Sequence, residues 1–371
     1  MKSTLTSMFG IDVPIFAFSH CRNVVAEVTR AGGLGVLGTS YYGPDALEQE
    51  LSWIDSQVGD KPYGINLLLA TSYERVGKDS VDFRRLPVEH ASFVRDLCDE
   101  AGIPPLPAAE RDGMLDREVA QIHMTPEHAQ QLVDVALRHP KIKLFVSALG
   151  IPPKEIVDQL HANGIKVGAM TGKVEHALRH KAAGLDLVIA QGSEAAGHTG
   201  TVNSMVLWPE VVEAVAPMPV LAAGGIGRGR QMAAAFALGA QGVWCGSIWL
   251  GTRESELEPE MKELLFKASS SDTVQTRSRT GKPARMLRSR LTDAWEQPDA
   301  PEFLPMPWQT VLNTEPRLRI ERARHPEFMT YPVGQIVGLM KEETSVRQVI
   351  YDMLEEFGET AQSMGEMADF Q

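Results

Sequence analysis

Short apolar runs alternate with segments of helical periodicity along the first two thirds of the chain. The apolar runs lie at residues 13–18, 34–37, 63–69, 143–149, 165–170, 185–190, 219–223 and 242–248, and helical patterns separate most of them, as at 23–30, 44–58, 174–183 and 230–238. Such alternation is typical of βα units wound around a parallel sheet. Eight strands of this kind predict an α/β fold, namely a TIM (β/α)8 barrel.

Two regions interrupt this regularity and predict additions to the barrel. The segment 71–140 is too long for one βα connection and carries Pro104-Pro105-Leu106-Pro107, so it predicts the third helix plus an excursion inserted after the third strand. Beyond residue 254, a helical pattern at 258–267 precedes a polar, basic stretch at 269–290, an irregular Pro-rich stretch at 296–307 and renewed helical periodicity at 333–364. We therefore predict a barrel over 1–253 with its insertion at 71–140, a cap over the barrel mouth at 254–332, and C-terminal helices at 333–371 that pack back on the barrel.

Composition narrows the class of protein. The chain has 371 residues, a net charge of -12 and 43% hydrophobic residues, which supports a large core and disfavours nucleic-acid binding, since phosphate backbones attract basic surfaces. Its three cysteines, Cys21, Cys98 and Cys245, lack metal-ligand spacing, and no apolar secretion signal opens the chain. The uncharged stretch 231–252 divides into a helical half and a strand-like half, which does not predict a membrane span. We expect a cytoplasmic enzyme for a small-molecule substrate, without a metal, nucleic acid or membrane as partner; a homodimer stays open.

The last two apolar runs contain small residues in a pattern typical of phosphate binding. Gly224-Gly225 follows the first run, and Gly246-Ser247 lies within the second. Glycine lets backbone N–H groups approach a phosphate, and the loops after the seventh and eighth strands of such barrels often share one. The glycines of GGIGRG are spaced wrongly for the dinucleotide fingerprint GxGxxG. We therefore expect the N–H groups of Gly225, Gly246 and Ser247 to bind the phosphate of a mononucleotide.

Polar residues that follow the predicted strands should meet at the catalytic end of the barrel. The set comprises Ser19, His20, Asn66, Ser147, Thr171, Gln191, Glu194 and His198. His198 lies on a Gly-flanked loop and could carry a proton near neutral pH, or it could only bond the backbone. Glu194 could orient His198 or cap the start of a helix. The amides of Asn66 and Gln191 suit the donor and acceptor edges of a flat heteroaromatic ring, unless they only satisfy polar groups of the core.

Six basic residues gather in the predicted cap of this acidic chain. They are Arg277, Arg279, Lys282, Arg285, Arg288 and Arg290. A solvated, salt-bridged surface is one interpretation. The other is a region of positive potential that attracts an anionic substrate tail or the phosphates of a pyridine nucleotide.

Several of these motifs together resemble one known family. The chain is similar to the nitronate monooxygenase (2-nitropropane dioxygenase) family, which includes flavin-dependent enoyl-ACP reductases, in PIFAFSH, AGGLGVLG, KPYGINLLLA, IAQGSEAAGHTG, PVLAAGGIGRGRQMAAAFALGAQGVWCGS and YPVGQIVGL. The resemblance covers most of the chain outside 71–140 and implies a TIM barrel that binds FMN without covalent attachment. The implied FMN-binding residues are Ala17, Phe18, Ser19, Asn66, Gln191, Ala196, Gly197, Gly224, Gly225, Trp244, Cys245, Gly246 and Ser247. His198 matches the histidine of the family's EAGGH loop, which implies a catalytic role.

Two departures from the family pattern bear on the expected chemistry. Nitronate monooxygenases carry a Phe-His-Phe-Gly run whose histidine handles the nitroalkane proton, whereas this chain has Ser147-Ala148-Leu149-Gly150, so Ala148 stands in place of that base. A preformed anionic nitronate would not need the base. Phe18-Ser19-His20 replaces the usual Ala-Pro-Met, and His20 could substitute as an acid or base.

The resemblance implies an FMN-dependent oxidoreductase, like nitronate monooxygenase, that oxidises alkyl nitronates with O2 through reduced flavin. His198 and His20 are the expected catalytic residues. The missing base and the basic cap leave an alternative open, a reductase of an enoyl thioester or quinone that takes electrons from NAD(P)H. A third interpretation, from another class, is a barrel that binds flavin or phosphate without turnover.

Overall fold

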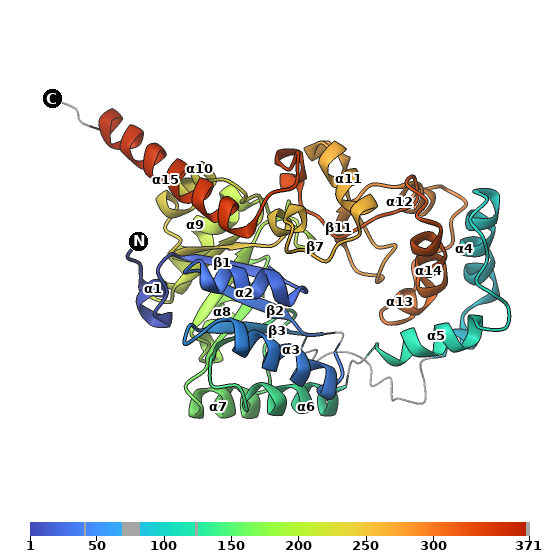
Figure 1. Ribbon diagram of the computed structural model, residues 1–371, viewed down its shortest axis with the longest axis horizontal. Helices are drawn as coiled ribbons and strands as arrows, with labels where there is room; N and C mark the ends of the chain where they lie inside the picture. Colours follow the sequence, from blue (N-terminus) through green and yellow to red (C-terminus); the bar gives the residue numbers. More distant parts are fainter. Residues whose placement is uncertain (41, 69–81, 123–124, 369–371) are drawn as a thin grey trace.

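The computed structural model describes residues 1–40, 42–68, 82–122 and 125–368, and in it eight parallel strands close into a barrel (Figure 1). Each strand pairs with the next, and the last pairs with the first. The strands are β1 (Ile15–Ser19), β2 (Leu34–Gly38), β3 (Tyr63–Leu67), β4 (Ile142–Ser147), β5 (Lys166–Thr171), β6 (Leu187–Gln191), β8 (Val220–Ala223) and β9 (Gly242–Cys245). The predicted TIM barrel is confirmed. Residue 69 of the predicted third strand, and residues 71–81 and 123–124 of the predicted insertion, lie outside the described residues.

Helices connect the strands around the outside of the barrel. They are α2 (Arg22–Arg30), α3 (Pro44–Gln57), α6 (Pro126–Ala136), α7 (Lys154–Ala162), α8 (Val174–Ala182), α9 (Ser204–Val215) and α10 (Gly229–Ala237). The sequence pattern did not predict α9, because its apolar residues are nearly continuous and Pro209 lies inside it. The other six follow predicted apolar runs.

Alternate residues of the strands fill the barrel interior. One hydrophobic cluster joins Phe16, Leu144 and Leu221 of the strands to Leu5 and Phe9 of α1 (Thr4–Phe9). Because α1 packs against the start of β9, it closes the end at which the strands begin. The opposite end, where active sites of such barrels are built, faces the cap.

The insertion after β3 and the segment after β9 form a second body beside the barrel. From the insertion come η1 (Phe83–Arg85), α4 (Val88–Glu100) and α5 (Arg111–Ala120), which lie beside α13 (Trp308–Leu312) and α14 (Thr314–Ala323) (Figure 1). Val94 and Cys98 of α4 share one hydrophobic cluster with Leu312 and Ile320. The sequence-based division assigned the insertion to the barrel domain, whereas the apolar side of α4 packs against the cap. Among the described helices of the insertion, α6 packs on α3 of the barrel.

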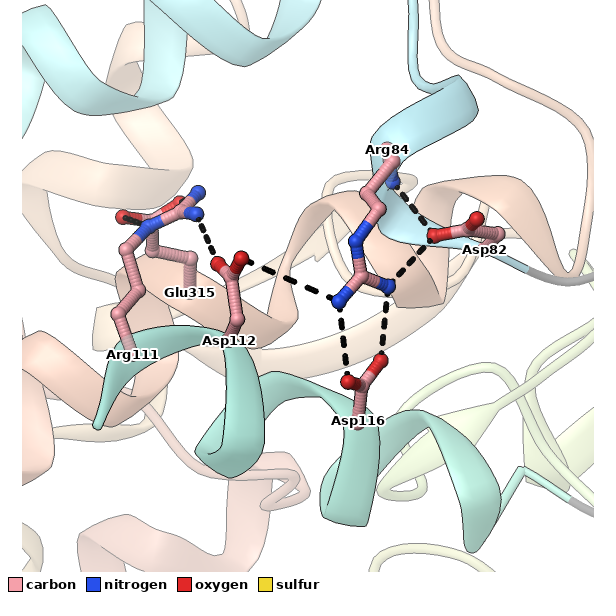
Figure 2. A network of polar contacts seen from close by, with 6 residues as sticks. All are labelled: Asp82, Arg84, Arg111, Asp112, Asp116 and Glu315. Atoms are coloured by element: carbon pink, nitrogen blue, oxygen red, sulfur yellow. Dashed lines mark hydrogen bonds and ion pairs between the residues drawn. The ribbon is translucent and has the colours of Figure 1, made fainter. Parts of the chain in front are cut away.

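Charged side chains also join the insertion to the cap. Figure 2 shows Arg84 among three carboxylates of the insertion, one of them Asp116 at 2.9 Å. Arg111 of α5 donates from Nη2 to Glu315 of α14 over 2.7 Å. Arg319, a buried residue of α14, donates from Nε to the carbonyl of Pro104 over 3.1 Å. These contacts tie α14 to segments about 200 residues earlier in the chain.

The remaining elements complete the cap and the C-terminus. They are η2 (Ser247–Gly251), α11 (Pro259–Lys267), η3 (Ser270–Asp272), β10 (Thr273–Thr276), β11 (Ala284–Leu287), α12 (Arg290–Ala294), η4 (Gln335–Leu339) and α15 (Val346–Ala368). The predicted helix at 258–267 and the irregular stretch at 296–307 are confirmed, whereas the polar stretch 269–290 forms a hairpin that the pattern did not predict. α15 packs on α10 and α2, and its C-terminal end projects from the barrel (Figure 1). Among the described residues, no helix combines the length and apolarity needed to cross a bilayer.

Candidate active site

His198 belongs to a short strand that joins the cap to the barrel. The strand β7 (Gly197–His198) pairs antiparallel with β11 and completes a three-stranded sheet in the order β10-β11-β7. The Nε2 atom of His198 lies 2.8 Å from Oγ1 of Thr280, in the turn between β10 and β11. Gly197 has a φ of 68°, a conformation that favours glycine. The predicted loop after the sixth barrel strand therefore holds His198 in a defined position against the cap.

The surroundings of His198 make its imidazole a weak base. Burial, together with the positive charges of Lys282 and Arg279, lowers the pKa of His198 to about 4. The imidazole is therefore uncharged at neutral pH and has little tendency to take up a proton. The sequence predicts that His198 could carry a proton near neutral pH; burial of the ring, with two cations of the cap beside it, lowers its pKa well below that range.

His20 follows β1 at the same end of the barrel. Its Nδ1 lies 3.2 Å from the carbonyl oxygen of Gly38, at the end of β2. A Cβ atom placed on Gly38 would lie 2.6 Å from the imidazole, so the glycine provides the space for this ring. Desolvation by the surrounding protein lowers the pKa of His20, although the side chain reaches the surface; the Gly38 carbonyl opposes this shift, and the charge of Arg279 adds to it. The pKa values of both expected catalytic histidines are therefore lowered, and Arg279 contributes to each shift.

The inner side of the site fits a flat heteroaromatic ring. Phe18 and Trp244 are stacked, with ring centroids 6.1 Å apart and planes 21° apart. Asn66 of β3 is buried, and its Nδ2 has no hydrogen-bond partner in the described part of the chain. An unsatisfied buried donor costs about 1–3 kcal/mol, which a ligand acceptor would offset. A stacked aromatic pair and an available amide donor, both on strands of the barrel, are groups that suit a flavin ring.

The ends of β8 and β9 fit a phosphate group. Gly224 and Gly225 have φ values of 100° and 68°, and a Cβ atom on Gly225 would lie 3.2 Å from a carboxylate oxygen of Glu194. Within the described residues, the N–H groups of Gly225, Gly246 and Ser247 donate to no protein acceptor. Several such N–H groups brought to one place form an anion-binding site. The sequence predicts these three donors for a phosphate, and the described protein groups leave them available for one.

Hydrogen bonds from segment 333–335 join the loop after β6 to the residues that follow β9. The pattern of apolar residues did not predict this role. The N–H of Gln335 donates to the carbonyl of Glu194, and the N–H of Gly334 donates to Oγ of Ser247, each over 2.9 Å. A Cβ atom on Gly334 would lie 2.8 Å from the Glu194 carbonyl oxygen, so this close approach requires glycine. These residues belong to the motif YPVGQIVGL, which is the sequence feature that could have indicated this role. The Glu194 carboxylate accepts from the N–H of Ser204 over 3.3 Å and thus caps α9 instead of orienting His198.

Several other residues expected to bind the flavin have side chains that are buried or already bonded within the protein. Nε2 of Gln191 donates to the carbonyl of Ala196 over 3.2 Å and supports the loop before β7. Oγ of Ser19 accepts from the N–H two residues later and is used within its own turn. Ala17 and Cys245 are buried in the cluster under the outer helices, so only their backbone could contact a ligand at the barrel mouth. Burial raises the pKa of the Cys245 thiol to about 12.

Ala148 lies at the end of β4, on the same rim. Its N–H donates to the carbonyl of Leu67 over 2.9 Å, next to the end of β3. A methyl side chain cannot accept a proton. The rim therefore presents two weakly basic imidazoles and an alanine where the family resemblance implied a base.

The six basic residues of the cap have different roles. Arg288 and Arg290 pair with Asp293 and Glu327 at the surface, over 2.8 and 3.2 Å, as a salt-bridged surface requires. Arg279 instead lies near both imidazoles, which supports the second interpretation at the barrel mouth.

Comparisons with known proteins agree with this geometry. The nitronate monooxygenase family model matches residues 2–356. The candidate monooxygenase Rv1533 of Mycobacterium tuberculosis is 49% identical over 370 residues, which is 97% of each chain. The solved nitroalkane oxidase from Streptomyces ansochromogenes has a TM-score of 0.80 and 26% identity, over 98% of this chain and 100% of that one. FabK from Thermotoga maritima has a TM-score of 0.74 and 29% identity, over 99% of both chains. The protein is an oxidoreductase, and its chain belongs to the nitronate monooxygenase family.

Proposed function

We propose that the protein binds FMN non-covalently and oxidises an alkyl nitronate, the anion, in preference to the neutral nitroalkane, with O2 as the electron acceptor. The observation that carries this proposal is the weak basicity of the site, where the pKa of His198 is about 4 and Ala148 cannot act as a base. A neutral nitroalkane must first lose a proton from carbon, and a weak base provides little driving force for that step. A preformed nitronate has already lost it.

Different residues would bind the ring and the phosphate of FMN. Nδ2 of Asn66 would donate to an acceptor on the ring, which Phe18 and Trp244 would support from the barrel interior. The N–H groups of Gly225, Gly246 and Ser247, at the ends of β8 and β9, would bind the phosphate. When bound, the flavin supplies the redox chemistry, because it can take an electron pair from the substrate and deliver it to oxygen.

His198 would position the substrate as a neutral hydrogen-bonding group. Its Nε2 is engaged by Thr280, which leaves Nδ1 to contact the substrate. His20, with its ring seated over Gly38, would contribute a second neutral imidazole from the other side of the mouth. Neither imidazole would need to change protonation state for a nitronate to react.

One observation favours a second candidate function. The positive charges of Arg279 and Lys282 beside His198 would also suit a phosphate-bearing donor such as NAD(P)H. The protein would then be a reductase of an enoyl thioester or a quinone, as in the flavin-dependent enoyl reductases of this family.

The experiment that separates these functions measures anaerobic bleaching of the flavin in the purified protein. A preformed alkyl nitronate, the matching neutral nitroalkane, NADH and NADPH are added in separate reactions. We expect the nitronate to bleach the flavin roughly a hundredfold faster than the nitroalkane, because no base assists proton removal. Bleaching by a nicotinamide nucleotide alone would assign the reductase, and bleaching by none of the four would indicate a binding protein without turnover. Colourless protein that takes up no added FMN would refute the proposal.

A further inference from the structure

The turn between β10 and β11 is fixed from several sides. The N–H of Gly281 donates to the carbonyl of Arg277, and Nε of Arg277 donates to the carbonyl of Gly281, each over 2.8 Å. The carbonyl of Ser278 accepts from a glutamine side chain of α13 over 2.8 Å. Thr280 meets His198 over the 2.8 Å contact already described. The residue at the centre of this turn, Arg279, is therefore carried on a firmly held backbone.

Arg279 differs from the other arginines of the cap. Its side chain is half-exposed and forms no ion pair or hydrogen bond with any residue that the structure describes. Arg288 and Arg290, by contrast, each pair with a carboxylate. The charge of Arg279 acts on both His198 and His20, which follow β6 and β1 respectively. A positive group that has no counter-ion among the described residues thus lies where the cap faces the end of the barrel.

We infer that Arg279 binds an oxyanion of the substrate at the barrel mouth. A guanidinium presents paired N–H donors in a plane, which match two oxygens of a planar anion. In a chain with a net charge of -12, a guanidinium that has no ion pair among the described residues, and whose charge acts on both histidines, is also the local feature that attracts an anion. The identity of that anion as a nitronate rests on the proposed function. The existence of the oxyanion site does not.

The test uses nitrate, a planar and unreactive oxyanion, as the probe. The flavin-loaded protein is titrated with sodium nitrate at constant ionic strength, and the change in flavin absorbance gives the dissociation constant. The variants are Arg279→Gln, Arg279→Lys and the matched control Arg288→Gln, which removes an equal charge from the same hairpin. We expect Arg279→Gln to weaken nitrate binding roughly tenfold or more and Arg279→Lys to weaken it less, since charge remains without the planar fork. Arg288→Gln should stay within about twofold, because its guanidinium is exposed and paired elsewhere.

The outcomes separate this inference from the proposed function. Equal nitrate affinity in Arg279→Gln and Arg288→Gln, or no nitrate binding by the unaltered protein, would overturn the inference even if a nitronate bleaches the flavin. Loss of nitrate binding in Arg279→Gln would support it even if no nitronate reacts. Titrations with NADPH and NADH identify the source of the oxyanion, because a site for the extra phosphate of NADPH would lose its preference for NADPH in Arg279→Gln, whereas a nitronate site would not.

Discussion

The crossing of α10 and α15 at Gly229 gives a prediction whose size follows from the structure. A Cβ atom placed on Gly229 would lie 2.2 Å from the carbonyl oxygen of Met353, 2.3 Å from the N atom of Phe357 and 2.8 Å from the carbonyl carbon of Glu356. These are backbone atoms, which cannot rotate away as a side chain would. In Gly229→Ala the two helices must therefore separate, and overpacking of this kind costs about 1–3 kcal/mol of unfolding free energy.

The assay is urea unfolding of the purified protein, with Gly358→Ala as the matched control. Gly358 lies inside α15, and a Cβ atom there meets no other atom within 4 Å. Gly358→Ala should therefore raise the unfolding free energy of the protein by about 0.5–1 kcal/mol, because alanine favours the helix. Gly229→Ala should also weaken FMN binding, since α10 begins at Gly229, four residues after Gly225. Unchanged stability in Gly229→Ala would show that α15 does not press on α10 as described.

Three further predictions concern single side chains. Glu356→Gln should lower the unfolding free energy in urea by roughly 1 kcal/mol, because Glu356 accepts from Arg228 over 2.7 Å and from Arg230 over 2.5 Å. The loss stays small because both arginines are exposed and water can solvate them; no loss would show that these ion pairs are neutral for stability. His198→Gln should flatten the pH dependence of stability between about pH 6.5 and pH 4, measured by urea unfolding at several pH values. In the unaltered protein the unfolded chain takes up a proton in that window while folded His198, with its pKa near 4, does not, so stability falls as pH falls; equal slopes would contradict the lowered pKa. Cys245 should resist alkylation at pH 8 in the folded protein and react after denaturation, because burial raises its pKa to about 12; rapid labelling of Cys245 in peptides of the folded protein would contradict its burial.

The barrel was predictable because its signals are local. Each strand is a short apolar run, and each small residue at the ends of β8 and β9 is visible in the sequence itself. The short strand β7 was not predictable in this way. It comprises only Gly197 and His198, and it exists because β11, more than 80 residues later, supplies its hydrogen-bond partners.

The same limit applies to the chemistry of the site. The residue types at the rim indicated a phosphate site, amide donors and a histidine. The lowered pKa of His198 depends on its burial and on Lys282 and Arg279, which the fold brings to it from the cap. The capping role of Glu194 likewise depends on α9, which the apolar pattern did not reveal. The roles of His198 and Glu194 therefore depend on which residues the fold places beside them, and residue type alone does not reveal that.

The shared core of the insertion and the cap has a consequence for how the chain is made. A ribosome adds about 5–20 residues per second, and roughly 200 residues separate α4 from α14. Val94 and Cys98 on the apolar side of α4 therefore wait about 10–40 s for their packing partners after they are synthesised. During this interval the nascent chain exposes the apolar side of α4. Translation that stalls before α14 should therefore yield polypeptides that depend on chaperones to avoid aggregation.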